Sequence, residues 1–450
     1  MSKGTETDES LNRMRLDCDR IFRAGLAAVE PEKSVFRHCQ RHGDILEIDG
    51  TAFDLSRFNR VLLLGAGKAG APMAGALEKI LGGRLSRGLV LVKYGHVQLL
   101  EKTELVQAGH PVPDGNGLEG TKRLMELAEK ADQGTLVICV LSGGGSALMP
   151  WPAPGIDLAD KQETTRLLLE CGASIHEINT VRKHLSRVKG GRLASAVYPG
   201  TLACLVLSDV IGNDLDIIAS GPGVPDPGTF EQCMEIVHGY GLESRLPVSV
   251  QKHLKKGAEK RVRETPKPGD PVFDNTFHAV IACGMDALKA AAAKAEALGY
   301  HPYILSDDVS GETVDAAGEH VRIALSIKAG AHGVSPPACL LSGGETTVTL
   351  QNPGKGGRNQ EFALKCALDI AGLDNIAVLS AGTDGTDGPT DAAGGLVDTS
   401  SKRRAEKSGF DARHHLDGHD AYPLLEAAGD LYKTGPTFTN VMDMRVILVK

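Results

Sequence analysis

The chain has 450 residues, 42% of them hydrophobic and 24% charged, so we expect a globular protein of two or three domains. A formal net charge of -8 argues against nucleic-acid and anionic-membrane partners, because both attract clustered positive surface. The nine cysteines contain no C-x-x-C pair, and the first residues lack the apolar core of a signal peptide. We therefore expect reduced thiols and a cytoplasmic location.

Helix-like and strand-like segments alternate along most of the chain. Apolar spacing from Leu11 to Val29 predicts an opening helix that ends before Pro31. Apolar, often β-branched runs predict strands, in chain order at 60–64, 88–92, 136–141, 201–207, 277–281, 303–305, 338–341 and 376–379. Helical segments between such strands predict an α/β fold in two lobes, each a mostly parallel sheet flanked by helices.

A domain boundary is predicted where the apolar periodicity stops. Between Lys256 and Pro271 the sequence KGAEKRVRETPKPGDP is rich in charge and proline. We expect an N-terminal α/β domain over residues 1–256, a linker over 257–274 and a C-terminal α/β domain over 275–450.

The first glycine loop, GAGKAG, follows a predicted strand and precedes a predicted helix. Its G-x-G-x-x-G frame, with Gly65 and Gly67, indicates a dinucleotide site. No acidic residue lies between Glu78 and Glu101 to bind a ribose, which weakens NAD but leaves NADP open. Lys68 at the helix start suits a phosphate oxygen, although a solvated lysine is the commoner fate of such a residue.

A second glycine loop follows the strand-like run in VICVLSGGGSALM. Its amides, from Gly143 through Gly144 and Gly145 to Ser146, predict a cradle for an anion. A nucleophilic Ser146 is the alternative, but the last glycine of G-x-S-x-G is replaced by Leu148. The segment LLSGGETTV repeats the theme with Gly343, Gly344 and Thr346.

A basic segment covers residues 178–194, INTVRKHLSRVKGGRLA, without one acidic residue. Arg182, Lys183 and Lys189 are its candidates for binding a substrate carboxylate or phosphate. A solvated basic helix face is the alternative.

Aspartates crowd two loops that follow predicted strands. Asp209 and Asp214 lie in one, and Asp384 and Asp387 lie in the other, where carboxylates suit Mg²⁺ or a general base. Turn and helix capping is the alternative. Arg358 follows the glycines of GKGGRNQ, and its planar fork suits a phosphoryl group or a surface ion pair.

Nine segments in order resemble motifs of one family: GAGKAG, AGHPVPD, LSGGGSAL, INTVRKHLSRVKGGRLA, LSDVIGNDLDIIASGP, LSGGETTV, GKGGRNQE, SAGTDGTDGPTDAAG and TGPTFTNV. This is the glycerate 2-kinase family, also called the MOFRL family, whose members often carry the name hydroxypyruvate reductase. The resemblance covers nearly everything from about residue 10 onward. It implies a Rossmann-like N-terminal domain, a MOFRL C-terminal domain and an active site in the cleft between them.

The resemblance also implies phosphorylation of D-glycerate at its 2-hydroxyl by ATP with Mg²⁺, giving 2-phosphoglycerate and ADP. The residues proposed for catalysis in the family fall on Lys68 and Arg358, and we add Asp209 as a candidate base. We expect the phosphates of the nucleotide to bind at Gly65, Gly67, Gly143, Gly144, Gly145, Ser146, Gly343, Gly344 and Thr346. We expect glycerate to bind at Arg182, Lys183 and Lys189. We expect the metal ion to bind at Asp214, Asp384 and Asp387.

Other functions stay open at this point. An NAD(P)H-dependent hydroxypyruvate reductase would use GAGKAG, a serine hydrolase would use Ser146, and a sugar-phosphate binding protein would turn nothing over. A homo-oligomer is also possible. The usual family ending is TGPTGTNVND, whereas this chain has Phe438 and Met442 in place of glycine and asparagine. These larger side chains leave the preferred acceptor open.

Overall fold

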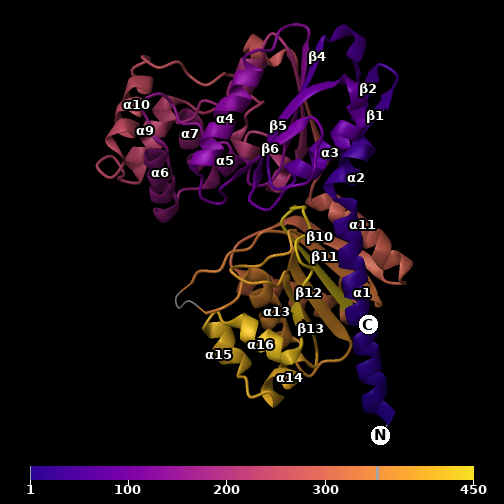
Figure 1. The fold of residues 1–450 in the computed structure, drawn as a ribbon. Helices are drawn as coiled ribbons and strands as arrows, with labels where there is room; N and C mark the ends of the chain where they lie inside the picture. Colours follow the sequence, from indigo (N-terminus) through magenta and orange to yellow (C-terminus); the bar gives the residue numbers. More distant parts are fainter. Residues whose placement is uncertain (1, 351–353) are drawn as a thin grey trace. The chain divides into compact units, whose positions relative to one another are not determined.

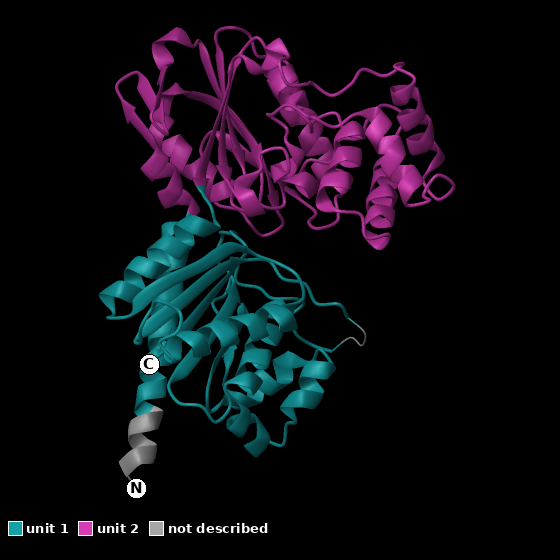
Figure 2. Cartoon of the chain, turned by 180° about the vertical axis from the view of Figure 1, so that it is seen from behind, with its two compact units in different colours: residues 1–30, 282–450 teal, residues 31–281 magenta. Residues whose placement is uncertain are grey.

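The computed structural model describes residues 2–350 and 354–450, with side chains from residue 9 onward (Figure 1). The chain divides into two compact units (Figure 2). Unit 1 comprises residues 1–30 and 282–450, and unit 2 comprises residues 31–281. No helix in the described part of the chain is long and apolar enough to cross a membrane.

Unit 2 is built on a six-stranded sheet with the order β6-β5-β4-β7-β8-β9. Its strands are β4 (Arg60–Ala66), β5 (Leu85–Lys93), β6 (Thr103–Ala108), β7 (Thr135–Leu141), β8 (Thr201–Leu207) and β9 (Thr276–Ala282). The pairings from β6 through β8 are parallel. The strand order reverses between β4 and β7, as in doubly wound nucleotide-binding folds, which confirms the Rossmann-like expectation.

Continuous apolar runs account for this sheet, because a parallel sheet is covered by helices on both faces. All seven residues of β7 are buried. The sheet packs against α3 (Gly70–Leu81), α4 (Gly115–Ala128) and α8 (Arg192–Val197). A separate apolar core joins four helices that lie to one side of the sheet (Figure 1): α6 (Leu158–Glu170), α7 (Ile175–His184), α9 (Phe230–Gly239) and α10 (Val248–Ala258).

Unit 2 also contains a small antiparallel sheet that precedes the large one. It consists of β1 (Cys39–His42), β2 (Ile45–Ile48) and β3 (Thr51–Asp54), and it follows α2 (Pro31–His38). A single helical turn, α5 (Gly145–Leu148), begins within the second glycine loop.

Unit 1 has a six-stranded sheet with the order β10-β11-β15-β12-β13-β14. The strands are β10 (His301–Val309), β11 (Ala338–Gly344), β12 (Ile376–Gly382), β13 (Gly394–Asp398), β14 (Leu431–Tyr432) and β15 (Asp443–Val449). Only β10 and β11 pair in parallel, and the other four pairings are antiparallel. The expectation of a mostly parallel sheet is therefore wrong for this unit, because β15 lies antiparallel between β11 and β12.

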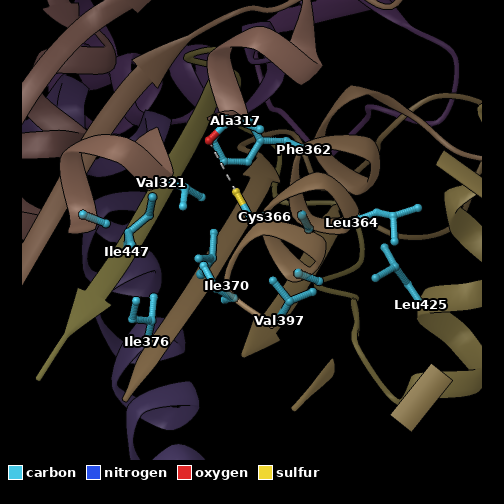
Figure 3. Packing of buried hydrophobic residues seen from close by; sticks show 14 of the residues in the cluster. Ala317, Val321, Phe362, Leu364, Cys366, Ile370, Ile376, Val397, Leu425 and Ile447 are labelled. Carbon is cyan, nitrogen blue, oxygen red and sulfur yellow. Dashed lines mark hydrogen bonds between the residues drawn. The ribbon is translucent and has the colours of Figure 1, made fainter. Parts of the chain in front are cut away.

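Helices cover both faces of the sheet in unit 1. Phe362 and Cys366 of α13 (Arg358–Asp369), with Ile370 just after it, pack with Val321 of α12 (Thr313–Lys328) and Ile447 of β15 in a buried apolar core (Figure 3). The helix α1 and α11 pack against the sheet, where Met444 of β15 meets the backbone of Gly25. The helices of this unit are α1 (Ser2–Ala28), α11 (Gly284–Ala297), α12 (Thr313–Lys328), α13 (Arg358–Asp369), α14 (Ser401–Lys407), α15 (Ala412–Asp417) and α16 (Ala421–Ala428).

The division of the chain differs from the predicted one at both ends. Helix α1 belongs with the C-terminal residues, because Arg15 forms ion pairs of 2.8 Å with Asp398 and with Asp430. The predicted linker 257–274 lies inside unit 2, where Glu264 accepts a hydrogen bond from His184 at 2.9 Å. Its polar composition serves ion pairs within that unit instead of a connection between domains.

Gly65 at the end of β4 gives a test of how tightly this sheet packs. A Cβ there would overlap the carbonyl oxygen of Val140, whereas a Cβ on Gly83 would meet nothing within 4 Å. We expect Gly65→Ala to lower the free energy of unfolding by about 3 kcal/mol, because backbone cannot yield to the added methyl group. Urea unfolding followed by circular dichroism measures the change, and Gly83→Ala is the control. Equal stability of the two variants would contradict this packing.

Candidate functional site

Two glycine loops interlock where β4 and β7 end in unit 2. The N–H of Lys68 donates to the carbonyl of Gly143 at 2.9 Å, and the N–H of Ala69 donates to the Oγ of Ser142 at 3.0 Å. Ligands of doubly wound sheets bind at the carboxyl ends of the strands where the strand order reverses. This pair of loops therefore marks the candidate site of unit 2.

The backbone N–H groups of the GAGKAG loop that would bind a dinucleotide donate hydrogen bonds within the protein instead. Besides Lys68 and Ala69, Gly67 donates its N–H to Leu91 at 3.0 Å, and Gly70 donates to Gly67 at 3.0 Å. A Cβ on Gly67 would overlap Ser142, so this glycine permits the close approach of the two loops. The structure gives Gly65 and Gly67 a packing role in place of the predicted phosphate contact.

The second loop leaves its amides open. Gly145 donates its N–H to Ser142 at 3.2 Å, but the N–H groups of Gly143, Gly144 and Ser146 have no acceptor within residues 2–350 and 354–450. Gly144 has a φ of 86°, a left-handed conformation that glycine adopts without strain. Open amides at such a turn suit an anion, as predicted.

Lys68 and His110 flank this turn. A Cβ added to Gly144 would lie 2.8 Å from Cδ2 of His110 and 3.5 Å from Cγ of Lys68. The aliphatic stem of Lys68 therefore runs beside the second glycine of the cradle. This placement agrees with the predicted contact of Lys68 with a phosphoryl group.

The hydroxyl of Ser146 lies in a chain of polar groups without a base. Its Oγ lies 2.8 Å from the Oγ of Ser220, which donates to Oδ1 of Asn179 at 3.1 Å. A nucleophilic serine needs a histidine or another base at this distance. The arrangement does not support the hydrolase alternative.

A cavity of about 460 Å³ opens beside the cradle and is lined by cations. Its charged and titratable lining groups are Lys161, Arg166, Arg182, Lys189 and His110, and no carboxylate lines it. The residues that line it are His110, Pro111, Val112, Pro113, Gly144, Ser146, Ala147, Lys161, Gln162, Thr165, Arg166, Leu169, Arg182 and Lys189. The predicted substrate ligands Arg182 and Lys189 thus share one cavity with Gly144 and Ser146.

Two of these cations are almost completely buried. Lys161 is 6% exposed and Lys189 is 1% exposed. Burial lowers the pKa of Lys161 to about 7 and that of Lys189 well below its usual value, and it also lowers the pKa of Arg182. The Nζ of Lys189 donates to the carbonyl of Ser146 at 2.8 Å, which ties the basic segment to the cradle.

Sequence reasoning missed Lys161. It lies in α6 on the same face as the buried residues Thr164, Leu167 and Leu168. The sequence did hold one indication: Lys161 precedes Thr164 by three residues and Leu168 by seven, a spacing that places all three on one face of a helix.

Lys183 has a different role from the predicted one. It is 3% exposed, and its Nζ forms ion pairs with Asp216 at 3.0 Å and with Asp226 at 3.4 Å. Adjacent residues of a helix point in directions about 100° apart, so Arg182 and Lys183 face different surroundings. Lys183 neutralises buried carboxylates, whereas Arg182 reaches the cavity.

Two of the three predicted metal ligands, Asp384 and Asp387, accept backbone N–H groups through their carboxylates. Oδ1 of Asp384 accepts from the N–H of Thr386 at 3.1 Å, and the backbone carbonyl of Asp214 accepts from Ile217 at 2.9 Å. Asp209 is the second residue after β8 and is half-buried. Across the described ranges no group of three or more histidine, cysteine, aspartate or glutamate side chains is arranged to hold a metal ion.

Asp387 caps the start of α13. Its two carboxylate oxygens accept from the N–H of Asn359 at 3.1 Å and from the N–H of Gln360 at 2.9 Å. Burial raises the pKa of Asp387 to about 6, while these two N–H groups oppose the shift. Both oxygens are occupied by donors, so the residue positions a helix in place of the predicted metal contact.

Arg358 begins α13 and is fixed by two carboxylates. Its Nε and Nη2 donate to Asp443 at 2.7 and 2.9 Å, and its Nη1 lies 2.8 Å from Glu345. Burial alone would lower the pKa of Arg358, but Asp443 and Glu345 raise it above its usual value. The guanidinium is therefore held charged in one orientation, as a group that stabilises phosphoryl charge must be.

The glycines of the LSGG repeat in unit 1 lie at the end of a paired strand. Gly343 and Gly344 belong to β11 and pair with Met444 and Asp443 of β15. The Oγ1 of Thr346 accepts from the hydroxyl of Thr313 at 2.9 Å. These residues support the strand that leads to Glu345, and the predicted phosphate contacts of Gly343, Gly344 and Thr346 remain untested.

Comparison with known proteins places the chain in a family. Residues 17–255 match the model described as "Domain of unknown function (DUF4147)", and residues 338–443 match the MOFRL family. A glycerate 2-kinase of Pyrococcus horikoshii is 39% identical over 96% of both chains. The chain belongs to the glycerate 2-kinase (MOFRL) family.

Two further relatives of this family bear on the fold and the function. The crystal structure of a glycerate kinase from Thermotoga maritima superimposes with a TM-score of 0.86 at 37% identity, covering 98% of this chain and 100% of that one. A protein of Agrobacterium vitis whose name includes hydroxypyruvate reductase is 39% identical over 96% of this chain and 93% of its own length.

The two departures from the family ending fall on strained backbone. Phe438 has a φ of 61° and Met442 a φ of 71°, a conformation that glycine and asparagine adopt most readily. These are the residue types of the usual glycerate 2-kinase ending at the two positions. Phe438 is 47% exposed, whereas Met442 is buried.

The substitution Lys183→Met tests whether Lys183 stabilises the fold through its ion pairs. We expect it to lower the free energy of unfolding by about 3 kcal/mol, because it leaves the buried carboxylate of Asp226 without its ion pair. Thermal or urea unfolding measures the effect, with the exposed Lys122→Met as the control for loss of one positive charge. Unchanged stability would mean that Lys183 is not needed to neutralise Asp226.

Phe438→Gly should relieve backbone strain. We expect the variant to gain about 1 kcal/mol of unfolding free energy, since the left-handed conformation costs a side-chain-bearing residue about that much. The midpoint of chemical unfolding measures it. Val97 is also half-exposed but has no positive φ, so Val97→Gly should lose stability. A loss of stability in both variants would show that Phe438 contributes contacts worth more than its strain.

Proposed function

We propose that the protein phosphorylates D-glycerate at its 2-hydroxyl, using ATP with Mg²⁺ and giving 2-phosphoglycerate and ADP. One observation carries the proposal: a cavity lined by cations and free of carboxylates lies beside open amides at the strand ends of unit 2. The names of the Pyrococcus horikoshii and Thermotoga maritima relatives supply the reaction.

Phosphoryl transfer depends on positioning and on neutralising charge. In our proposal the amides of Gly143, Gly144 and Ser146 bind a phosphate of the nucleotide. Lys68 and Arg358 stabilise charge on the transferred group. Arg358 is already oriented by its fork to Asp443, whereas for Lys68 the hydrogen bond to Gly143 fixes the backbone from which the side chain extends.

The acceptor carries a carboxylate, and the cavity offers cations to bind it. We assign this role to Arg182 and Lys189, and we assign to Asp209 the orientation of the hydroxyl that attacks. Lys183 leaves the predicted substrate set, because it is engaged by Asp216 and Asp226.

Mg²⁺ would reach the site with ATP and needs only one or two protein carboxylates in addition to phosphate oxygens. We propose Asp214 and Asp384 for this role, because carboxylate oxygens are ligands that Mg²⁺ prefers and the contact of the Asp384 carboxylate with Thr386 is made by Oδ1. Asp387 does not fit, because N–H donors occupy both of its oxygens. When bound, the metal would neutralise charge on the phosphates.

We also propose a cytoplasmic site of action. All nine cysteines are free, and seven of them are buried. Free thiols in this number are typical of a reducing compartment.

The hydrogen bonds of the GAGKAG loop argue against the alternative function, an NAD(P)H-dependent hydroxypyruvate reductase. A Rossmann site binds the pyrophosphate of NAD(P) with the amides of its first glycine loop. Here the amides of Gly67, Lys68 and Ala69 donate within the protein. The kinase is therefore our single proposal, and the Agrobacterium vitis name makes reductase activity the assay to run beside it.

Two substitutions test the proposed transfer. We expect Lys68→Met and Arg358→Lys each to lower kcat by about 100-fold or more, because each removes one oriented charge or fork from the transferred group. Phosphorus NMR of a reaction with ATP, Mg²⁺ and D-glycerate reports transfer and identifies the phosphorylated hydroxyl.

The control variants are Lys79→Met and Arg322→Lys, which alter exposed cations paired with Glu32 and Glu319. They should retain the rate of the parent protein. Full turnover by Lys68→Met and Arg358→Lys would refute the assignment of these residues. Steady oxidation of NADPH with hydroxypyruvate, and no phosphoryl transfer, would refute the function.

A further inference from the structure

Lys161 occupies a position that costs stability. Its side chain is 6% exposed, and its Nζ has no hydrogen-bond partner among the residues that the structure describes. Burying an ammonium group without a partner is unfavourable, and a packed apolar side chain would serve the fold better. A cost of this kind is typical of residues kept for binding or catalysis.

Among the residues that the structure describes, those lining the cavity of Lys161 include no carboxylate. Arg182 of α7 and Lys189 of the segment after α7 share its cavity, as does His110 of the loop after β6. Arg166 of its own helix lies at the cavity but is half-exposed and forms ion pairs with Glu163 and Glu170. Since the described lining has no carboxylate, Lys161 is either neutral in the free protein or paired with a bound anion.

The position of Lys161 is fixed by its neighbour. The side-chain amide of Gln162 donates to the carbonyl of Pro113 at 2.6 Å, which ties α6 to the loop 110–113. The same cavity is lined by Lys161 and Gln162 of α6 and by the cradle residues Gly144 and Ser146. The ammonium group is therefore presented by a rigid element.

We propose that Lys161 is an oxyanion-binding residue of this cavity, and that with Arg182 and Lys189 it binds a carboxylate or phosphoryl group of the substrate. The cavity volume of about 460 Å³ accommodates a small organic acid or its phosphate. The identification of that acid as glycerate rests on the proposed function, whereas the binding of an oxyanion does not.

Binding should be coupled to uptake of a proton. Burial, together with the neighbouring Arg182, lowers the pKa of Lys161 to about 7, so the charge on this amine changes with pH in the neutral range. An anion favours the charged form and raises this pKa in the complex. Affinity is then greatest below pH 7 and falls, by up to about tenfold per pH unit, as the pH rises above it.

Isothermal titration calorimetry tests the proposal with two probes, inorganic phosphate and D-glycerate, from pH 6 to pH 9. Two buffers of different ionisation enthalpy report the proton uptake at each pH. We expect Lys161→Met to weaken binding at least tenfold and to reduce the uptake, while its thermal unfolding midpoint stays equal or rises. Lys122→Met, which removes an exposed lysine of unit 2, should leave all three quantities unchanged.

Lys161→Arg is the second variant, because arginine keeps the charge but does not titrate in this range. It should retain binding with a smaller pH dependence, and it decides the question if Lys161→Met fails to fold. An effect of Lys161→Met on D-glycerate alone would assign the cavity to the carboxylate, and an effect on phosphate alone would assign it to a phosphoryl group.

Unchanged affinity for both probes in a folded Lys161→Met protein would overturn the proposal. So would pH-independent binding in the parent protein. The outcome is separable from the proposed function: phosphate binding that depends on Lys161 in a protein without kinase turnover would sustain this inference alone. Kinase turnover with an unchanged KM for glycerate in Lys161→Met would sustain the function alone.

Discussion

The candidate site of unit 2 depends on the interlocking of two glycine loops. Lys68 and Ala69 donate their N–H groups to Gly143 and Ser142, so hydrogen bonds from the first loop hold the second loop in place. The second loop is thereby fixed, and its N–H groups at Gly143, Gly144 and Ser146 have no acceptor among the described residues. A close approach of backbones demands glycine at Gly67, since a Cβ there would overlap Ser142. One loop is thus the support and the other the binding surface.

The cations of the basic segment fall into two groups, those paired with carboxylates of the protein and those that line the cavity. Lys183 and His184 turn toward buried or half-buried carboxylates and become part of the fold. Arg182 and Lys189 turn toward a cavity without carboxylates and are left for a ligand. The helical repeat makes this separation possible, because neighbouring residues of α7 face different sides. Composition alone showed a basic stretch, and only the packing shows which of its charges are already neutralised.

Much of the fold was predictable, and the limits have physical causes. Apolar runs predicted every strand of the large sheet in unit 2 except β6. Strands that are buried on both faces have continuous apolar sequences, which are easy to recognise. The same runs do not encode direction, so the antiparallel sheet of unit 1 was missed. Lys68, Arg182, Lys189 and Arg358 were predicted from motif and charge, and their roles in a site stay predictions. Lys161 was missed because a single lysine in an amphipathic helix resembles a surface residue, and the capping role of Asp387 depends on tertiary contacts.

The missed direction of β15 matters for the one arginine that the motifs singled out. Because β15 runs antiparallel to β11 and β12, its first residue, Asp443, pairs with their last residues, Gly344 and Gly382. A parallel strand would have carried this aspartate to the opposite edge of the sheet. The antiparallel insertion therefore sets Asp443 beside Glu345, and these two carboxylates hold Arg358 at the start of α13. The strained backbone at Met442 immediately precedes Asp443, so the cost of the left-handed conformation falls where the chain turns to deliver that carboxylate.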